Sequence, residues 1–400
     1  MSIADFSGRL RPDACPGALQ VHEAADGPLA RVRLPGGAIS PVRLRELAAC
    51  AADLGSDVIE LTSRANVQVR GLRSPAAFAE RIAAAGLLPS EAHERVRNIV
   101  ASPLGGRTGP GLLDPQPLVE ALDRALCSRP RLAGLPGRFL FAVDEGSGDM
   151  LALGADVTFF DGRLLLAGVD FGLAVGADAA AGRMVAAAEA FLDERPEGDR
   201  GAWRIAELDN GPARIATRLH VTGTPDRATA TPLSRPTAPR AGRVGQWDGR
   251  VALEVVVPLG RLSAAQARAI AAAAEVNGPA GTIGAPGPGG VPVRFTPWRT
   301  VVLLDLPPTT IDRAARMLEA AGLVTDPASP WAGVSACTGR PGCAKSLADV
   351  QEDARRWVAT LDGPPATPVH WAGCERRCGL PRGRVVQMVA TGDGYQERHQ

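Results

Sequence analysis

The sequence predicts an α+β protein that contains an internal duplication. Two segments, VRLPGGAISPVRLRELAACA from Val32 and VVVPLGRLSAAQARAIAAAA from Val255, align without a gap. Each reads as a strand, a Pro-x-Gly turn, a serine N-cap and a helix. A β-branched strand pair follows each helix, so the repeated unit is predicted to be β-α-β-β. The two copies predict a pseudo-two-fold internal repeat.

The strand pairs that follow the two helices are VIELTSRANVQVRGL and VPVRFTPWRTVVLLDL. When the two copies are compared, Arg64 roughly matches Arg299. Between the copies, PQPLVEALDRALC has leucines at helical spacing, and DVTFFDGRLLLAGV predicts two strands joined at Asp161-Gly162. After the second copy, TTIDRAARMLEAAGL is predicted to be a helix with a threonine cap and a glycine stop. These elements predict a mixed α+β protein.

Length, charge and hydropathy limit the class of protein. A chain of 400 residues has room for about two to three domains. The net charge of +1 excludes a global field that would recruit nucleic acid or an anionic membrane. No apolar run reaches the length of a transmembrane helix, and the first residues lack an apolar signal core, so we expect a cytoplasmic protein. Residues 222–246 are rich in proline, threonine and arginine and are predicted to be a linker.

The spacing of the cysteines indicates a metal site near the C-terminus. Cys337 and Cys343 are separated by TGRPG, and Cys374 and Cys378 by ERR. The segment AKSLADVQEDARRWVATL has apolar residues at helical spacing, so Cys343 is predicted to lie at a helix N-terminus, where the dipole favours a thiolate. This pattern favours a [4Fe-4S] cluster, with structural zinc and unligated thiols as alternatives.

The other three cysteines give weaker signals. Cys50 and Cys127 lie in helical patterns and are expected to be small buried side chains, whereas Cys15 follows no such pattern.

The cysteine segments ACTGRPGCAKS and AGCERRCG resemble the cluster motif of the sulfite and nitrite reductase superfamily. In that superfamily two cysteine pairs hold a [4Fe-4S] cluster beside a tetrapyrrole. The resemblance implies two ferredoxin-like half-domains and two reductase-like α/β domains that bind the tetrapyrrole and the cluster. The implied boundaries are 11–75 and 247–308 for the half-domains, and 90–221 and 309–400 for the reductase-like domains, the last of which carries the cluster.

Three further motifs of the superfamily can be sought in this chain. Thr62-Ser63-Arg64 resembles its T-x-R strand motif, and Arg97-Asn98 resembles its arginine before asparagine. A strand with two lysines corresponds to LPGRFLFAV, which has Arg138 at the first lysine and Leu140 at the second. The loss of one ammonium group argues against the reduction of small anions, because that chemistry needs donors where charge develops.

RPDACPG at the start, SPLGG after Asn98 and VRFTPWR at residues 293–299 resemble one branch of the superfamily, the precorrin-3B synthases. This resemblance implies that the substrate is precorrin-3A and that O2 supplies a C20 hydroxyl group, with a γ-lactone formed from the ring A acetate. Electrons would enter through the cluster. It also implies a non-haem iron, for which the sequence shows no ligand set. A sirohaem-dependent ferredoxin nitrite or sulfite reductase is the alternative, and a non-enzymatic iron-sulfur carrier is a third hypothesis.

The residues expected at the site are mainly arginines, because planar guanidinium groups pair with the carboxylates of a tetrapyrrole. No dinucleotide-binding fingerprint is present, so a separate NAD(P)H-dependent or ferredoxin-type donor is expected. The catalytic candidates are Arg64, Arg97 and Arg138. The substrate-binding candidates are Arg64, Asn66, Arg97, Asn98, Arg138 and Arg299, with Arg70 and Arg294 as further pocket cations. Arg340, Lys345, Arg376 and Arg377 flank the predicted cluster.

Overall fold

The computed structural model describes residues 13–195, 201–220, 226–227, 241–276, 290–381 and 383–399. The chain divides into two compact units. Unit 1 comprises Met1–Gly17, Arg33–Gly37 and Leu88–Arg235, and unit 2 comprises Ala18–Val32, Ala38–Leu87 and Pro236–Gln400. Unit 2 therefore holds most of both predicted half-domains together with the cysteine pairs.

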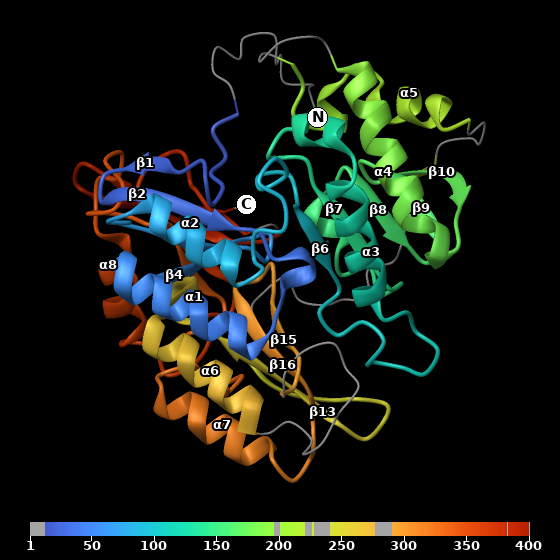
Figure 1. Cartoon of the computed structure of the whole chain (residues 1–400). Coiled ribbons are helices and arrows are strands. Elements are labelled where there is room, and N and C mark those ends of the chain that lie inside the picture. Colours follow the sequence, from blue (N-terminus) through green and yellow to red (C-terminus); the bar gives the residue numbers. More distant parts are fainter. Residues whose placement is uncertain are drawn as a thin grey trace. The chain divides into compact units, whose positions relative to one another are not determined.

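Two five-stranded sheets form the duplicated part of unit 2 (Figure 1). The first has the order β1 (His22–Ala24), β2 (Gly27–Val32), β5 (Val67–Val69), β4 (Val58–Leu61) and β14 (Arg261–Ser263). The second has the order β12 (Gly242–Gly245), β13 (Val251–Val256), β16 (Thr300–Leu306), β15 (Val293–Phe295) and β3 (Ala38–Ile39). The predicted β-α-β-β repeat is confirmed. The last residues of the predicted linker form β12, and most of the rest lies outside the described residues.

The two copies exchange a short strand. β14 of the second copy pairs with β4, and β3 of the first copy pairs with β15, both antiparallel. Each exchanged strand leads into a helix, α1 (Pro41–Leu54) or α6 (Ala264–Val276), and these two helices pack together (Figure 1). The exchange makes each sheet depend on both copies, so the duplicated halves form one folding unit.

The predicted serine caps are present at both helices. Ser40 Oγ accepts a hydrogen bond from the N–H of Arg43 at the start of α1. At the start of α6, Ser263 and Gln266 form a reciprocal capping box, because each side chain accepts the backbone N–H of the other residue. The helix α2 (Pro75–Ala84) packs against α1, and α7 (Ile311–Ala320) packs against α6.

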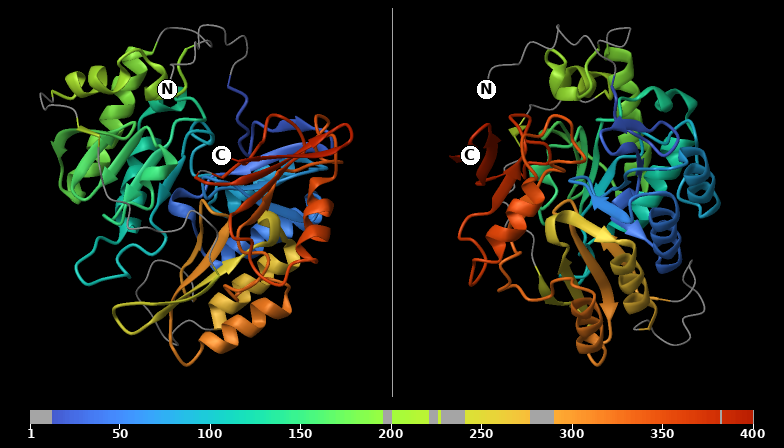
Figure 2. Two further views of the ribbon diagram at one scale, coloured as in Figure 1. Left: turned by 180° about the vertical axis from the view of Figure 1, so that it is seen from behind. Right: turned by 90° about the vertical axis from the view of Figure 1, so that its left-hand side faces the viewer.

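The C-terminal segment, red in Figure 2, forms a four-stranded sheet with α8 (Val350–Val358) packed against it. Its order is β17 (Val334–Ala336), β18 (Val369–Ala372), β19 (Val386–Thr391) and β20 (Gly394–His399). β17, β18 and β19 are parallel neighbours, and β20 is antiparallel to β19. Trp371 packs beside Trp357 and Tyr395 in the small core of this region, with ring centroids 5.9 and 4.8 Å away.

The described residues of unit 1 form a six-stranded mixed sheet and three α-helices. The strand order is β11 (Asp226–Arg227), β10 (Val169–Ala174), β9 (Arg163–Leu166), β8 (Val157–Phe160), β7 (Phe141–Asp144) and β6 (Ile99–Ala101). The helices are α3 (Pro115–Cys127), α4 (Ala177–Glu194) and α5 (Gly211–Arg218). β8 and β9 meet at Asp161-Gly162 as predicted, and both turn residues have positive φ, which this hairpin turn requires. The helices of the described residues include none long and apolar enough to cross a membrane.

Candidate functional site

The two cysteine pairs leave the same edge of the C-terminal sheet. Cys337 directly follows β17, and Cys374 lies two residues after β18. These strands are parallel neighbours, with Ala336 opposite Trp371, so the loops that follow them begin side by side. The N–H of Cys337 donates to the carbonyl of Trp371 at 2.9 Å, and the N–H of Gly373 donates to Cys337 Sγ at 3.2 Å. Parallel pairing therefore brings together cysteines that lie more than thirty residues apart in sequence.

The four thiols lie close enough to affect one another electrostatically. Burial raises the pKa of the Cys337 thiol, and negative charge on Cys378 or Cys343 raises it further, whereas the amides of Gly373 and Gly339 oppose this shift. Burial also raises the pKa of Cys378, and so does charge on Cys374 and Cys343. These thiols therefore form one cluster in which thiolates need a cation to stabilise them.

The sequence left two metal centres open for these cysteines, a structural zinc ion and a four-iron cluster. Tetrahedral zinc with Zn–S bonds of about 2.3 Å would place its sulfur ligands about 3.8 Å apart. Within the part of the chain that the structure describes, no three of these sulfurs lie within 4.8 Å of one another. A four-iron cluster binds each thiolate to a different iron and takes a wider set of sulfurs. Four thiolates brought to one sheet edge fit an iron-sulfur cluster, and four cysteines are also a ligand set of structural zinc.

The prediction that Cys343 lies at a helix N-terminus is wrong. The helix α8 begins at Val350, where Asp349 caps it by accepting the N–H of Glu352. Between the cysteines and this helix the chain turns back on itself, since Arg340 N–H donates to Ala348 O and Cys343 N–H donates to Gly339 O. These local hydrogen bonds outweigh the helical period of the sequence, and Leu347 is 49% exposed as a result.

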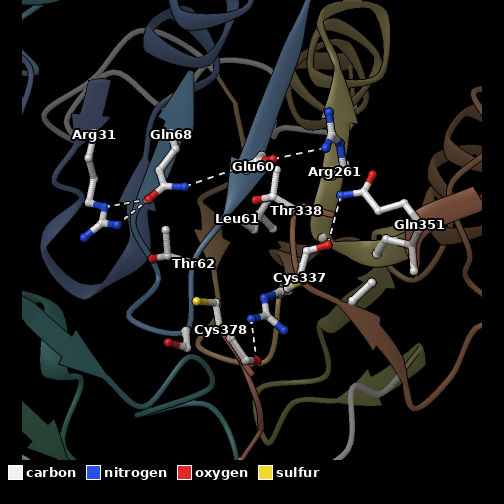
Figure 3. Close-up of a pocket in the computed structure, with 16 residues that line it drawn as sticks. Arg31, Glu60, Leu61, Thr62, Gln68, Arg261, Cys337, Thr338, Gln351 and Cys378 are labelled. Carbon is white, nitrogen blue, oxygen red and sulfur yellow. Dashed lines mark hydrogen bonds and ion pairs between the residues drawn. The ribbon is translucent and has the colours of Figure 1, made fainter. Parts of the chain in front are cut away.

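A pocket in unit 2 adjoins two of the cysteines (Figure 3). Its lining consists of Arg31, Glu60, Leu61, Thr62, Ser63, Gln68, Leu259, Gly260, Arg261, Arg299, Ala336, Cys337, Thr338, Gln351, Cys378 and Gly379. The lining includes residues of both duplicated halves and of the C-terminal sheet. The pocket therefore forms only where all three parts of unit 2 meet.

A row of charged and polar side chains crosses this pocket on the first sheet. Arg31, Gln68, Glu60 and Arg261 lie directly opposite one another on the neighbouring strands β2, β5, β4 and β14. Arg31 Nε donates to Gln68 Oε1 at 2.8 Å, Gln68 Nε2 donates to Glu60 Oε2 at 3.1 Å, and Arg261 Nη1 donates to Glu60 Oε1 at 3.1 Å (Figure 3). One buried carboxylate and two arginines leave a net positive charge in this row.

Arg299 reaches the pocket through a gap that two glycines provide. A Cβ atom at Gly260 would lie 2.5 Å from Arg299 Cδ, and one at Gly379 would lie 2.5 Å from Arg299 Nη2. Arg299 Nη2 donates to the carbonyl of Gly379 at 2.8 Å, next to Cys378. Burial lowers the pKa of Arg299, while the negative charges of Glu60 and Cys337 raise it. The guanidinium group stays protonated, because arginine is not deprotonated in proteins.

Only part of the predicted site lies at this pocket. Of the predicted residues, Arg299, Cys337 and Cys378 line it. Thr62 and Ser63 of the T-x-R motif also belong to the described lining, but Arg64 and Asn66 do not. Arg64 is half-buried in the turn, and Asn66 is buried and donates its N–H to Thr62 Oγ1 at 3.1 Å. Arg294 is buried in β15.

Some of the predicted arginines form hydrogen bonds in and around the cysteine loops and do not line the pocket. Arg70 forms a bidentate ion pair with Asp26 at 2.8 Å and donates to the carbonyl of Gly342, the residue before Cys343. Arg340 Nε donates to Ser346 O at 2.8 Å, and Arg377 Nη1 donates to Gln387 Oε1 at 3.1 Å. Lys345 and Arg376 are exposed.

The remaining predicted residues belong to unit 1. Arg97 is buried and forms a bidentate ion pair with Asp123 of α3, with both contacts at 2.7 Å. Asn98 donates to the carbonyls of Arg95 and Gly137. Arg138 is exposed and stacks over the ring of Trp203 at 4.8 Å.

The segment LPGRFLFAV is a strand only in its second part. β7 begins at Phe141, so Arg138 and Leu140 precede it. The Leu140 side chain is 3% exposed, and its N–H donates to Asp156 Oδ2 at 2.9 Å. The isobutyl side chain of Leu140 offers no hydrogen-bond donor, and its burial packs it in the core of unit 1.

The buried histidines of the described residues have structural contacts. His93 Nδ1 lies 2.8 Å from Ser90 Oγ, and His93 Nε2 lies 3.0 Å from Arg129 O. His370 Nδ1 lies 2.9 Å from Ser335 Oγ, and burial followed by the charge of Arg299 lowers the pKa of His370 to about 3. Neither histidine lies in a group of three close potential ligands.

Comparison with known proteins shows which proteins this fold and sequence are similar to. Residues 22–78 match the nitrite/sulfite reductase ferredoxin-like half domain. The solved structure of the NirA protein of Mycobacterium tuberculosis superposes with a TM-score of 0.73, covering 93% of this chain and 73% of that one at 24% identity. Most of the chain is thus similar to members of the nitrite and sulfite reductase superfamily, and its fold is that of a reductase of this kind. The predicted α+β reductase-like fold is confirmed.

Curated relatives within this superfamily are oxidoreductases. A precorrin-3B synthase of Sinorhizobium is 28% identical over 96% of this chain and 82% of its own length. A ferredoxin-nitrite reductase of Synechococcus elongatus is 26% identical over 91% of this chain and 76% of its own length. A sulfite reductase [ferredoxin] of Mycolicibacterium paratuberculosis is 28% identical, with coverage of 91% and 70%. The superfamily resemblance is thus confirmed, while these relatives carry out different reactions.

Proposed function

We propose that this chain is a precorrin-3B synthase, which hydroxylates precorrin-3A at C20 with O2 and forms the γ-lactone. The observation that carries the proposal is the similarity to a precorrin-3B synthase across 96% of the chain. The arginine-lined pocket beside Cys337 and Cys378 supports it, because a substrate with many carboxylates needs several fixed cations.

We propose that Cys337, Cys343, Cys374 and Cys378 hold a [4Fe-4S] cluster, because the pairing of β17 with β18 brings both cysteine pairs to one sheet edge. When bound, such a cluster supplies electrons one at a time. The amide of Gly373, which donates to Cys337 Sγ, would stabilise negative charge on that ligand. Arg70 would fix the loop before Cys343 through the Gly342 carbonyl.

The pocket residues would bind and orient the tetrapyrrole. Arg31 and Arg261 lie in the row that Glu60 and Gln68 connect, and Arg299 stands beside Cys378. Guanidinium groups held by neighbours lose little side-chain entropy on binding and can donate hydrogen bonds to substrate carboxylates. The substrate would thereby lie next to the point where electrons enter.

The reaction balances with one O2 and two electrons. One oxygen atom enters the C20 hydroxyl group, and the other leaves as water with two protons. The electrons would come from a separate NAD(P)H-dependent or ferredoxin-type donor. The proposal includes a non-haem iron as a further cofactor, for which we assign no ligands.

A sirohaem-dependent nitrite or sulfite reductase is the second candidate, which the similarity to such enzymes over 91% of the chain supports. Leu140 argues against it, because a buried isobutyl group cannot donate to an oxyanion where the reductases have a lysine.

Isotope labelling distinguishes the two. Anaerobically purified protein receives precorrin-3A, a reductant and ¹⁸O2, and mass spectrometry follows the product. One labelled oxygen in a hydroxylated lactone supports the proposal. Sirohaem absorption bands with turnover of nitrite or sulfite, and no change of precorrin-3A, would establish the reductase instead.

A further inference from the structure

Three buried carboxylates meet in unit 1, outside the pocket described above. Asp144, Glu145 and Asp149 each offer a carboxylate oxygen, and these oxygens all lie within 4.8 Å of one another. Their exposed fractions are 0%, 5% and 8%. Burial of an acidic group away from water is costly unless a cation, a hydrogen bond or a proton compensates it, so three together need an explanation.

The fold fixes where these groups lie. β6 and β7 are parallel neighbours with Ala101 opposite Val143, so Ser102 and Asp144 come together at the carboxyl ends of the two strands. Ser102 Oγ donates to Asp149 Oδ1 at 2.6 Å. Asp144 accepts the N–H groups of Gly146, Gly148 and Met150, each at 2.9 Å. Asp144 is thus held by backbone and Asp149 by a side chain.

Glu145 supplies an observation independent of the clustering. Glu145 is only 5% exposed, and its buried Oε2 atom has no hydrogen-bond partner. A carboxylate oxygen without a donor at such depth is costly to leave unsatisfied. Ser102 and Ser147 interact with the carboxyl group of Glu145, but a cation beside Oε2 would compensate the oxygen that has no partner.

Charge and donor type identify the ligand. Burial, followed by the charge of Asp149, raises the pKa of Asp144 to about 6 and raises the pKa of Glu145 as well. A monovalent ion would leave most of the negative charge of three carboxylates uncompensated, whereas a divalent ion neutralises two of the three. Carboxylate oxygens without sulfur or imidazole suit hard cations such as Mg²⁺, Mn²⁺ and Ca²⁺.

We infer that Asp144, Glu145 and Asp149 form a binding site for one hard divalent cation. All three oxygen donors lie at or after the end of β7, and the site does not depend on the identity of the substrate or on the cysteine cluster. Ser102 is a positioning residue, because it holds Asp149 in the orientation that faces the other two carboxylates.

Mn²⁺ is the probe for this site, because bound and free Mn²⁺ differ in their electron paramagnetic resonance signals. The full-length protein, purified anaerobically and freed of divalent ions with a chelator, is titrated with MnCl2. We expect one bound Mn²⁺ per chain, displaced by excess Mg²⁺ or Ca²⁺. Glu145→Gln keeps the shape of the side chain and should weaken Mn²⁺ binding by roughly 10- to 100-fold or more. Asp178→Asn, which removes an exposed carboxylate of α4 in the same unit, should bind as the wild type does.

Thermal unfolding distinguishes a variant that has lost the Mn²⁺ site from a variant that binds poorly because it is misfolded. Without added metal, Glu145→Gln should be at least as stable as the wild type, because it removes buried repulsion. Added Mn²⁺ should raise the melting temperature of the wild type and of Asp178→Asn but not of Glu145→Gln. No saturable Mn²⁺ binding by the wild type, or equal binding by Glu145→Gln, would overturn the inference and leave protonation as the way in which these carboxylates are stabilised.

Discussion

Arg299 in the second half of the chain occupies the backbone position of Ala65 in the first. Both residues have a left-handed conformation, with φ of 62° and 56°. Each turn begins with a threonine, Thr62 or Thr296, whose hydroxyl oxygen accepts the backbone N–H groups of the residues two and four positions later. The backbone N–H of each threonine donates to the carbonyl of the residue four positions later, Asn66 or Thr300. The residue that matches Arg64 is therefore Trp298, one position away from the match that the sequence suggested.

This correspondence allows a clean test of Arg299. Alanine already adopts this conformation at Ala65, so Arg299→Ala should fold, and it removes only the guanidinium group. We expect tetrapyrrole affinity to fall roughly 10- to 150-fold, since a hydrogen bond to a charged group contributes about 1.5 to 3 kcal/mol. Equilibrium binding measured by absorption of the tetrapyrrole checks this. Arg316→Ala, an exposed arginine of α7, is the control, and equal affinity in the two variants would remove Arg299 from the binding site.

The cysteine assignment predicts which thiols carry iron. Serine at Cys337, Cys343, Cys374 or Cys378 should remove most of the iron and inorganic sulfide, because each cysteine would bind a different corner of the cluster. Cys15→Ser and Cys127→Ser should retain both. Elemental analysis and sulfide determination on anaerobically purified protein give the result. A wild-type protein with one zinc and no sulfide would contradict the assignment.

The repeat and the cysteine pairs could be predicted because both are local signals. The Pro-x-Gly turns, the serine caps and the short spacings within each cysteine pair depend on residues close in sequence. The strand exchange could not be predicted, because β3 and β14 each have two or three residues and pair with the other copy. A single short strand has no periodicity that specifies its partner.

The same limit explains which pocket residues the sequence did not reveal. Arg31, Glu60, Gln68 and Arg261 form a row only after four strands pair in register, and one of these strands comes from the other copy. The start of α8 was misplaced because hydrophobic spacing continued through a turn that side-chain and backbone hydrogen bonds hold. Long-range pairing and local polar contacts determined these features.

Cys50 provides a test of burial by pH. It is fully buried in α1, and burial raises the pKa of its thiol to about 12. The folded state therefore keeps the proton where the unfolded state, with a pKa near 9, releases it. This contribution to stability is present below pH 9 and is lost as the pH rises toward 12, by up to about 1.4 kcal/mol per pH unit.

We expect the stability of the wild type relative to Cys50→Ala to decrease between pH 9 and pH 11, as measured by urea unfolding. Native alkylation at pH 8, read by mass spectrometry, should leave Cys50 unmodified until the protein unfolds. Rapid labelling of Cys50 in the native protein would show that the thiol is accessible and would contradict this prediction.

Arg97 separates a structural role from a substrate-binding role. Its side chain is 6% exposed and that of Asp123 is 19% exposed, and the two form a bidentate pair. Removal of one member of a buried pair leaves the other charge without a partner, so Arg97→Ala should lower the free energy of unfolding by about 3 kcal/mol. Arg97→Ala combined with Asp123→Ala should recover much of this loss, because no lone charge then remains. Urea unfolding of the two single variants and the double variant gives the coupling energy.

A substrate-binding role predicts a different pattern. Tetrapyrrole affinity would then fall in Arg97→Ala and in the double variant alike, while the free energy of unfolding would change little. The comparison therefore decides whether the arginine of this motif acts on the fold or on the ligand.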